Sequence, residues 1–205
     1  MNETKIEKVR IDDIYYNLNE LEKTAEVTEG PEGSEKYAKK ISIPSTITYN
    51  QTKYVVTRID EWAFGGCTKL ISVKIPDSVT SIGKEAFKFC DLISITLGNS
   101  ISSIEDETFF GCSSLKSISI PDGVTSIGEK AFYECRSLKS AIIPDCVTRI
   151  GDYAFESCTS LTSVTIPDNE TCIGDFAFRC CSSLKSITFS DNVKSIGKEA
   201  FNACI

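Results

Sequence analysis

The segment SIGKEAFKFC, residues 81–90, decides the fold because it recurs along the chain. Its other copies read RIDEWAFGGC (58–67), SIEDETFFGC (103–112), SIGEKAFYEC (126–135), RIGDYAFESC (149–158), CIGDFAFRCC (172–181) and SIGKEAFNAC (195–204). The aligned phenylalanines stand 23, 22, 23, 23, 23 and 23 residues apart, and the one missing residue falls between Cys90 and Leu92. Seven copies at a near-constant period predict seven similar structural repeats.

A second phrase lies between the copies, as in LKSISIPDGVTSI at residues 115–127. Alternation of Ile118 and Ile120 with serines predicts a short strand whose isoleucines face inwards. Pro121-Asp122 then predicts a turn, in which the aspartate accepts a hydrogen bond from its own downstream backbone. The pair Ala131-Phe132 follows a further short apolar run and predicts a single helical or 3₁₀ turn.

A unit of 23 residues cannot bury its own apolar side chains, so neighbouring units are expected to stack and share one core. Parallel strands lie about 4.8 Å apart, which places equivalent residues of successive units above one another. The sequence therefore predicts three ladders of buried side chains. They consist of Phe64, Phe87, Phe109, Phe132, Phe155, Phe178 and Phe201; of Leu70, Leu92, Leu115, Leu138, Leu161 and Leu184; and of Cys67, Cys90, Cys112, Cys135, Cys158, Cys181 and Cys204.

The two ends depart from the repeat. Extra residues at 49–57 interrupt the first unit and predict a hairpin around Asn50-Gln51-Thr52. Residues 14–18 and 24–28 are strand-like, and we interpret residues 1–40 as a β-rich N-terminal cap over repeats that occupy residues 41–205. The sequence stops in the middle of a unit, so we expect either continuation of the natural chain or end-to-end contact between copies.

The phrases IPDSVTSIGKEAF (75–87) and AFYECRSLKSAIIP (131–144) resemble the BspA-like leucine-rich repeats of bacterial surface proteins. The resemblance covers residues 41–205. It implies a leucine-rich repeat solenoid, a curved right-handed coil that is either β/α or β-rich, with parallel strands on one face. It also implies a cell-surface or secreted location and adhesion to a host or neighbouring-cell protein or glycan. Units that depart from the family pattern are expected to be looser, and the departures are Gly98 and Ser190 for proline, Glu105 for glycine and Glu170 for valine.

Composition narrows the classes of function. The chain has 41% hydrophobic and 25% charged residues, as an ordinary folded domain does. Histidine is absent, which removes histidine-based hydrolase triads and histidine-ligated zinc, so we expect no enzyme activity and no cofactor. The net charge is −7 and the basic residues are scattered singly along the sequence, so nucleic acid and anionic membranes are not expected as partners. Neither a signal peptide nor a membrane-spanning run is visible.

The ten cysteines raise the question of disulfides or metal. Seven lie on the ladder, at a position that suits a small, slightly polar buried side chain, and we expect them to be reduced structural thiols. Their spacing does not resemble the close pairs of a zinc site. Of the other three, Cys146, Cys172 and Cys180, we expect Cys180 to face solvent and to be the most reactive.

Aspartates form another column, at the turn that follows each predicted strand. Carboxylates at strand spacing can hold a calcium ion between repeats. Turn capping explains them better, because each aspartate has a local backbone role, and no metal site is predicted. The column consists of Asp77, Asp122, Asp145, Asp168 and Asp191, with Asn99 in the sixth place.

The outward positions of the predicted strands form the candidate binding surface. They make a flat, polar, hydroxyl-rich face, which is where partners dock on repeat proteins. Serine and threonine also simply tolerate solvent on a strand, and the residues alone favour neither reading. The positions are Ser72, Lys74, Ser94, Thr96, Ser117, Ser119, Ser140, Ile142, Ser163, Thr165, Ser186 and Thr188, with Lys116, Lys139 and Lys185 beside them.

The function predicted from these features is non-enzymatic macromolecular recognition, as an adhesion or protein-binding module that uses this strand face. A structural spacer, or a scaffold that presents another domain, is the alternative. A regulatory domain attached to an enzyme is a third hypothesis, since the fold does not decide among the three.

Overall fold

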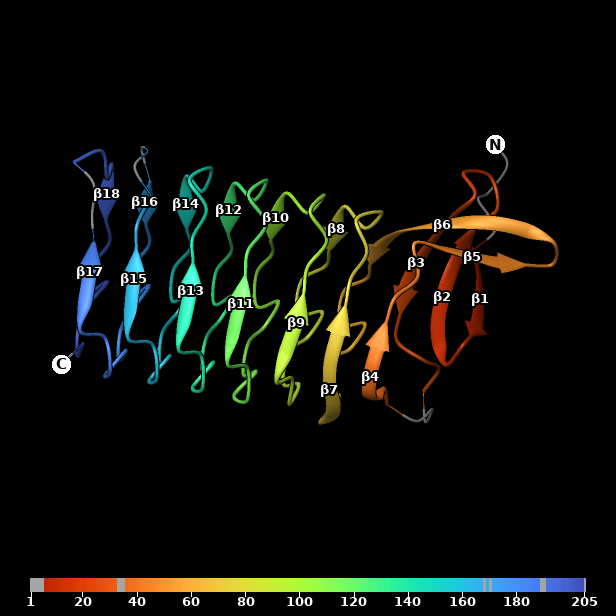
Figure 1. Ribbon diagram of the computed structural model, residues 1–205, viewed down its shortest axis with the longest axis horizontal. Coiled ribbons are helices and arrows are strands. Elements are labelled where there is room, and N and C mark those ends of the chain that lie inside the picture. Colours follow the sequence, from red (N-terminus) through yellow and green to blue (C-terminus); the bar gives the residue numbers. More distant parts are fainter. Residues whose placement is uncertain (1–5, 33–35, 168, 170, 189–190, 205) are drawn as a thin grey trace.

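The computed structural model describes residues 6–32, 36–167, 169, 171–188 and 191–204, apart from the side chain of Ile6. These residues form a long stack of similar rungs, with the N-terminal strands at one end (Figure 1). Each rung has a strand on the front of the stack, a turn, a shorter strand behind, and a compact run of turns that leads to the next rung. The regular structure of the described residues is all β, so the β-rich form of the predicted solenoid is the one observed.

The strands of the front row run parallel and pair in register, for example Ser117 with Ser140. Pairing is interrupted between β9 and β11, beyond the turn at Cys90 that is one residue shorter than the others. There the N–H of Lys116 still donates to the carbonyl of Ile93 at 3.3 Å. The row consists of β4 (Ala38–Ser42), β7 (Lys69–Lys74), β9 (Ser94–Thr96), β11 (Ser117–Ser119), β13 (Ser140–Ile142), β15 (Ser163–Thr165) and β17 (Ser186–Thr188).

A second row of two-residue strands lies behind the first and is also parallel and in register. At its N-terminal end the row continues into the long strand β6 (Thr52–Ile59), where Arg58 and Ile59 pair with β8. The two rows enclose the core from opposite sides. The back row consists of β8 (Ser81–Ile82), β10 (Ser103–Ile104), β12 (Ser126–Ile127), β14 (Arg149–Ile150), β16 (Cys172–Ile173) and β18 (Ser195–Ile196).

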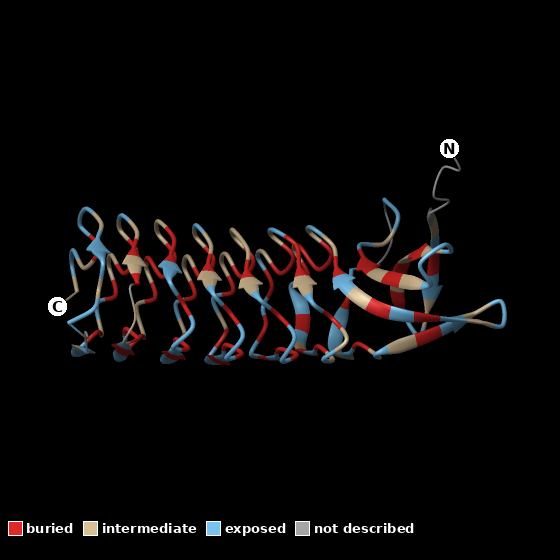
Figure 2. Ribbon diagram, turned by 90° about the horizontal axis from the view of Figure 1, so that it is seen from above, coloured by how far each residue is buried: buried red, intermediate tan, exposed pale blue. Residues whose placement is uncertain are grey.

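The N-terminal strands form a separate sheet that is joined to the back row through β6. In it, β1 (Ile6–Ile11), β2 (Ile14–Asn19) and β3 (Thr24–Thr28) are antiparallel, β3 runs parallel to β6, and β6 forms a hairpin with β5 (Thr46–Tyr49). Strands β2 and β3 lie where alternation predicted strands, and buried and exposed residues alternate along β6 (Figure 2). The hairpin turn is at Asn50 and Gln51, whose φ values of 47° and 63° are typical of a type I′ turn. Strand β4 opens the first rung at Ala38, three residues before the predicted start of the repeats.

The run of turns around Ala131-Phe132 is not the helical turn that the sequence predicted. Alternate N–H groups bond within the rung, as from Tyr133 to the Lys130 carbonyl at 3.1 Å. The N–H groups between them bond to the following rung, as from Phe132 to the Ala154 carbonyl at 2.7 Å. Lys130 has a φ of 52°, so the helical path is broken. Stacking therefore overrides the local preference, because the next rung offers an acceptor to every second N–H.

The phenylalanine ladder is present as predicted. The rings of Phe64 to Phe178 have no exposed area, and successive rings stack with centroids 4.9 to 5.4 Å apart. Phe201, in the last rung, is half-buried. Tyr37 continues the column beyond the first rung, its ring 4.7 Å from that of Phe64. Each fully buried ring contributes about 1.5–3 kcal/mol to the stability of the stack.

The cysteine ladder has a structural role that size alone does not explain. The Sγ of Cys158 donates to the carbonyl of Phe132 in the preceding rung at 3.2 Å, and that carbonyl also accepts the N–H of Cys135 at 3.1 Å. The same thiol bond recurs from Cys90 to Cys204. A small side chain with a weak donor is thus placed against a buried carbonyl, and all ten cysteines are free thiols, as expected for the ladder.

Departures from the repeat pattern have modest effects where they are described. Rings Phe87 and Phe109, on either side of the shortened turn, are 5.4 Å apart, the widest step of the ladder. Glu105, which stands where five other rungs have glycine, accepts a hydrogen bond from Ser103 at 2.6 Å. Ser190 and Glu170, for which looser rungs were also expected, lie outside the described residues, as does Asp168 of the aspartate column.

Candidate functional site

The twelve predicted binding positions lie together on the outer surface of the front strands, which we call the strand face. The parallel register places Ser117, Ser140, Ser163 and Ser186 side by side on successive rungs. Eleven of the twelve positions are exposed, and Ser72 is half-buried. Ile142 is 72% exposed, which is unusual for a large apolar side chain. The parallel register thus joins the predicted positions into rows along one surface.

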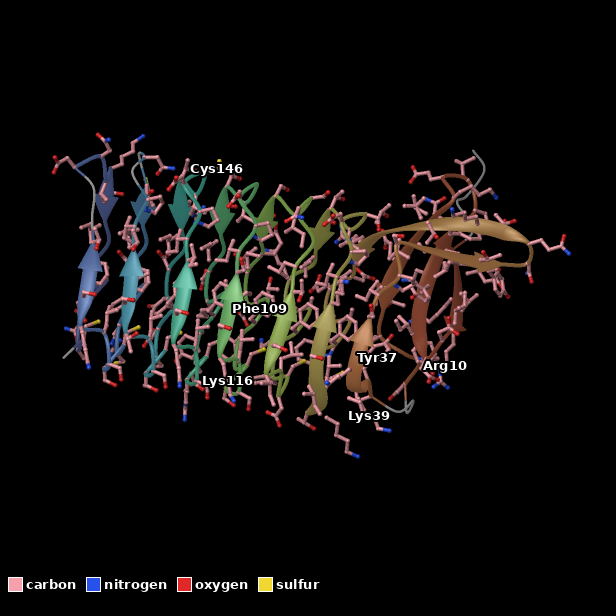
Figure 3. The ribbon with its side chains drawn as sticks, viewed as in Figure 1. Arg10, Tyr37, Lys39, Phe109, Lys116 and Cys146 are labelled. Carbon is pink, nitrogen blue, oxygen red and sulfur yellow. The ribbon has the colours of Figure 1, made fainter. Side chains whose placement is uncertain are left out.

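The strand face is also cationic, which corrects the interpretation that the basic residues are scattered singly. No acidic residue lies on the seven front strands or directly before them. In Figure 3, Lys39 and Lys116 lie along the same edge of the front row, and Cys146 lies at the opposite edge. Seven exposed lysines belong to this face: Lys39, Lys40, Lys69, Lys74, Lys116, Lys139 and Lys185.

A shallow hollow of about 300 Å³ lies in the strand face where it approaches the N-terminal sheet. Lys40 and Lys74 flank it, and Ser72, Ser94 and Thr96 line its floor. A larger cleft of about 450 Å³ separates β4 from the turn between β1 and β2. The smaller hollow carries lysine side chains and hydroxyl groups, so it offers hydrogen bonding and attraction of anions, whereas Asp12 and Asp13 also line the larger cleft and give it mixed charge.

A second surface, which the sequence reasoning missed, is formed by the turns between each back strand and the following cysteine; we call it the turn face. It carries aromatic rings that stack along the axis of the solenoid, such as Phe110 on Tyr133 at 4.8 Å and Tyr153 on Phe176 at 5.0 Å. Phe89 packs edge-on against Phe110 and is 48% exposed. The sequence carries a signal for these columns, because Phe110 and Tyr133 each directly follow a ladder phenylalanine, and Tyr153 and Phe176 each stand two residues before one.

Charged groups on the turn face neutralise one another. Lys88 binds Glu85 at 2.8 Å and also binds Glu107, and it lies 5.0 Å from the centre of the Phe110 ring. Burial lowers the pKa of Lys88, but the hydrogen bonds to Glu107 and Glu85 outweigh that effect, so its pKa is raised. The turn face is therefore satisfied internally by ion pairs and cation–π contacts.

Most thiols of the cysteine ladder are weak nucleophiles because they are buried. Burial raises the pKa of Cys112 to about 12, so its thiolate is scarce at neutral pH. Cys146, on the turn after β13, is the exposed thiol, while Cys172 and Cys180 are half-buried. This corrects the expectation that Cys180 faces solvent, because position 180 lies on the turn face, where neighbouring rungs partly cover it.

One member of the aspartate column bonds to the neighbouring rung. The carboxylate of Asp77 accepts the N–H of Asn99 in the following rung at 2.8 Å, whereas the predicted bond was to its own turn. Within the described residues, no group of three histidine, cysteine or acidic side chains is placed to hold a metal ion. In the same part of the chain, no helix could serve as a membrane span.

The repeats match a family model described as "BspA type Leucine rich repeat region", in six copies over residues 34–158 and 125–205. The chain belongs to this family. The resemblance seen in the sequence and the predicted leucine-rich repeat fold are thereby confirmed. Proteins of this kind are built as repeat scaffolds that generally bind other proteins, and nothing in the described residues shows catalysis.

Solved structures give the same assignment. A leucine-rich repeat protein from T. pallidum is 28% identical with a TM-score of 0.83, and the match covers 97% of this chain and 89% of that one. A leucine-rich repeat protein from Bacteroides ovatus is 30% identical with a TM-score of 0.70, and the match covers 95% of this chain but only 56% of that one. This chain thus spans little more than half of the Bacteroides ovatus protein. A search of curated proteins gives no match.

Proposed function

We propose that this protein is a non-enzymatic recognition module that binds another macromolecule through its strand face, as a cell-surface or secreted adhesion protein. The observation that carries the proposal is the continuity of the face: exposed hydroxyl and lysine side chains repeat in register over the front strands. Membership of a family of repeat proteins that bind proteins supports it. The proposed site comprises the twelve positions from Ser72 to Thr188 named above.

The proposed division of the chain serves this role. Residues 1–40 act as a cap on the first rung, residues 41–205 form the repeats, and the hairpin insertion at 49–57 extends the cap. A cap of this kind covers apolar side chains that the first rung would otherwise expose. The binding surface is then free to extend along the remaining rungs.

The test is to cover the face without changing its charge. Ser117→Tyr, Ser140→Tyr and Ser163→Tyr, combined, add bulk at three adjacent exposed positions, and tyrosine is well tolerated on strands. The parent and this variant are screened against an array of extracellular-matrix proteins, plasma proteins and glycans. A saturable interaction that the variant loses supports the proposal.

A matched control places the same bulk elsewhere, at Thr80→Tyr, Thr125→Tyr and Thr148→Tyr, which are exposed positions beside the back row. Loss of binding in this control as well would contradict the placement of the site on the strand face. A parent that binds nothing on the array would favour the alternative, a spacer that carries another domain.

A further inference from the structure

The distribution of charge between the strand face and the rest of the molecule is uneven. The chain has 22 basic and 29 acidic residues. Seven of the basic residues lie on the strand face, and none of the acidic residues that the structure describes lies on the seven front strands. A protein of net charge −7 thus has a row of strands whose charged side chains are all lysines, while exposed Asp91 stands before Leu92 where Lys69 stands before Leu70. Such a field attracts anionic partners and repels cationic ones.

Within the described part of the chain, the lysines of the strand face form no side-chain ion pair. Among the described residues, the ion pairs lie on the turn face or in the β1–β2 hairpin, as between Lys84 and Asp106 at 2.8 Å and between Arg10 and Asp13 at 2.7 Å. None of these pairs involves a lysine of the strand face. Off this face, ion pairs hold Arg10, Lys84, Lys88, Lys130, Arg136 and Arg179, and within the described residues no ion pair holds any of the seven lysines on it.

The spacing of the lysines adds to this argument. The N–H of Lys139 donates to the carbonyl of Lys116 at 3.0 Å, so these two residues lie side by side, each directly before a front strand. Like charges at strand spacing repel one another, which costs stability while the face is empty. A carboxylate placed between two such ammonium groups relieves the repulsion and forms charge-assisted hydrogen bonds.

Apolar side chains occur among the lysines. Ile71 and Ile93 are each 42% exposed, and the N–H of Ile93 donates to the carbonyl of Ile71, so they sit on adjacent rungs. Ile142, 72% exposed, adds a third branched apolar side chain. No aromatic residue lies on the seven front strands, so the platforms on which bases stack are missing. The face therefore combines open cations with aliphatic contact points.

We propose that the strand face binds an acidic protein segment, in which carboxylates meet the lysines and aliphatic side chains meet Ile71, Ile93 and Ile142. This inference rests on the proposed function, since it names the chemistry of the partner for the same face. Paired charges steer the encounter and set its salt dependence, while the buried aliphatic contacts supply the hydrophobic part of the affinity.

The probe is a synthetic peptide of alternating glutamate and leucine, with polyglutamate of equal length and heparin for comparison. Binding to the whole protein is measured by calorimetry at low and at physiological salt. The alternating peptide is expected to bind more tightly than polyglutamate, and its binding is expected to weaken as salt is added. Binding of the alternating peptide no tighter than that of polyglutamate would overturn the aliphatic part of the proposal.

Charge reversal tests the lysines. The variant Lys116→Glu/Lys139→Glu is expected to weaken binding of the alternating peptide by roughly tenfold or more, because two attractions become repulsions. The matched control is Lys53→Glu/Lys198→Glu, which changes the net charge equally at exposed positions off the strand face and is expected to bind as the parent does. Equal weakening in both variants would show a non-specific charge effect and overturn the proposal.

Ile142→Ser separates a protein partner from a sulfated polysaccharide. It is expected to weaken binding of the alternating peptide several-fold and to leave heparin binding unchanged. Two results together would identify the partner as a sulfated polysaccharide and not a protein segment. They are tight heparin binding that is lost in Lys116→Glu/Lys139→Glu, and peptide binding that is unchanged in Ile142→Ser. Self-association that is lost in Lys116→Glu/Lys139→Glu would instead make a second copy of the chain the occupant.

The two proposals fail separately. If a partner's binding is lost in the triple tyrosine variant but kept in Lys116→Glu/Lys139→Glu, the proposed recognition function is supported and the proposed acidic ligand is overturned. If a partner still binds the triple tyrosine variant, both proposals are overturned.

Discussion

At the scale of single residues, the close approach of successive rungs decides which side chains are tolerated. A methyl group at Gly128 would lie 2.6 Å from the backbone nitrogen of Asp106 and 2.7 Å from the carbonyl carbon of Glu105 in the preceding rung. These are backbone atoms that cannot rotate away. Gly128 is therefore favoured by the close approach of the two backbones, whereas Asp60 and Glu105 hold the equivalent position in their own rungs.

Gly128→Ala is expected to destabilise the protein by about 1–3 kcal/mol, because the rungs must move apart to admit the methyl group. Gly123→Ala is the matched control, since its nearest neighbour would be the Ile101 carbonyl oxygen at an ordinary 3.6 Å. The measurement is the urea midpoint followed by circular dichroism. Equal midpoints for the two variants would show that the rungs are less closely stacked than described.

At the scale of elements, one side chain joins the N-terminal sheet to the solenoid. Tyr37 is buried, packs on Phe64 and is hydrogen-bonded twice: its hydroxyl donates to the Thr28 carbonyl at 2.6 Å and accepts the N–H of Tyr15 at 2.9 Å. Strands β2 and β3 are thereby fixed against the first ring of the phenylalanine ladder. The proposed cap depends on this contact.

Tyr37→Phe keeps the ring and removes the hydroxyl, which leaves the Tyr15 N–H and the Thr28 carbonyl without that partner. The expected cost is about 1–3 kcal/mol, measured as faster hydrogen exchange in β2 and β3 and a lower urea midpoint. Tyr49→Phe, whose hydroxyl donates to Glu7 at 2.9 Å near the surface, is expected to cost much less because water replaces the lost bond. Similar losses in both variants would contradict a special role for Tyr37.

At the scale of the whole molecule, buried thiols occur along the length of the stack. They make the stability of the protein decrease at alkaline pH. Burial raises the pKa of Cys112 and of Cys181 to about 12, from 9.0 in an exposed thiol. Burial also raises the pKa of Cys135 and Cys158. The folded protein therefore holds protons that the unfolded chain releases above pH 9, and unfolding becomes more favourable in that range.

Stability is expected to be unaffected by these thiols below pH 9 and to fall as pH rises from there towards 12. Each thiol adds a slope of about 1.4 kcal/mol per pH unit within that window. The measurement is the urea midpoint against pH, with thiolate absorbance followed in parallel. Cys112→Ala removes one such group and should give a shallower slope; a slope equal to that of the parent would show that other groups cause the loss.

Much of this fold was determined by the sequence itself. The near-constant period places phenylalanine, leucine and cysteine one rung apart, and a 23-residue unit has no other way to bury them than stacking. The strand face was also predictable, because period-two alternation indicates which side chains point outwards. The hairpin at Asn50 and Gln51 was predictable from its turn residues and flanking alternation.

The tertiary structure decided what depends on contacts between rungs. The turn at Phe132 is not helical because every second N–H finds its acceptor in the next rung, which no local propensity records. The cysteine column is explained by hydrogen bonds from its thiols to phenylalanine carbonyls of the preceding rung, as from Cys158 to Phe132. The seven lysines of the strand face, from Lys39 to Lys185, are far apart in the sequence, and only parallel pairing in register gathers them on one surface while the carboxylates gather on others.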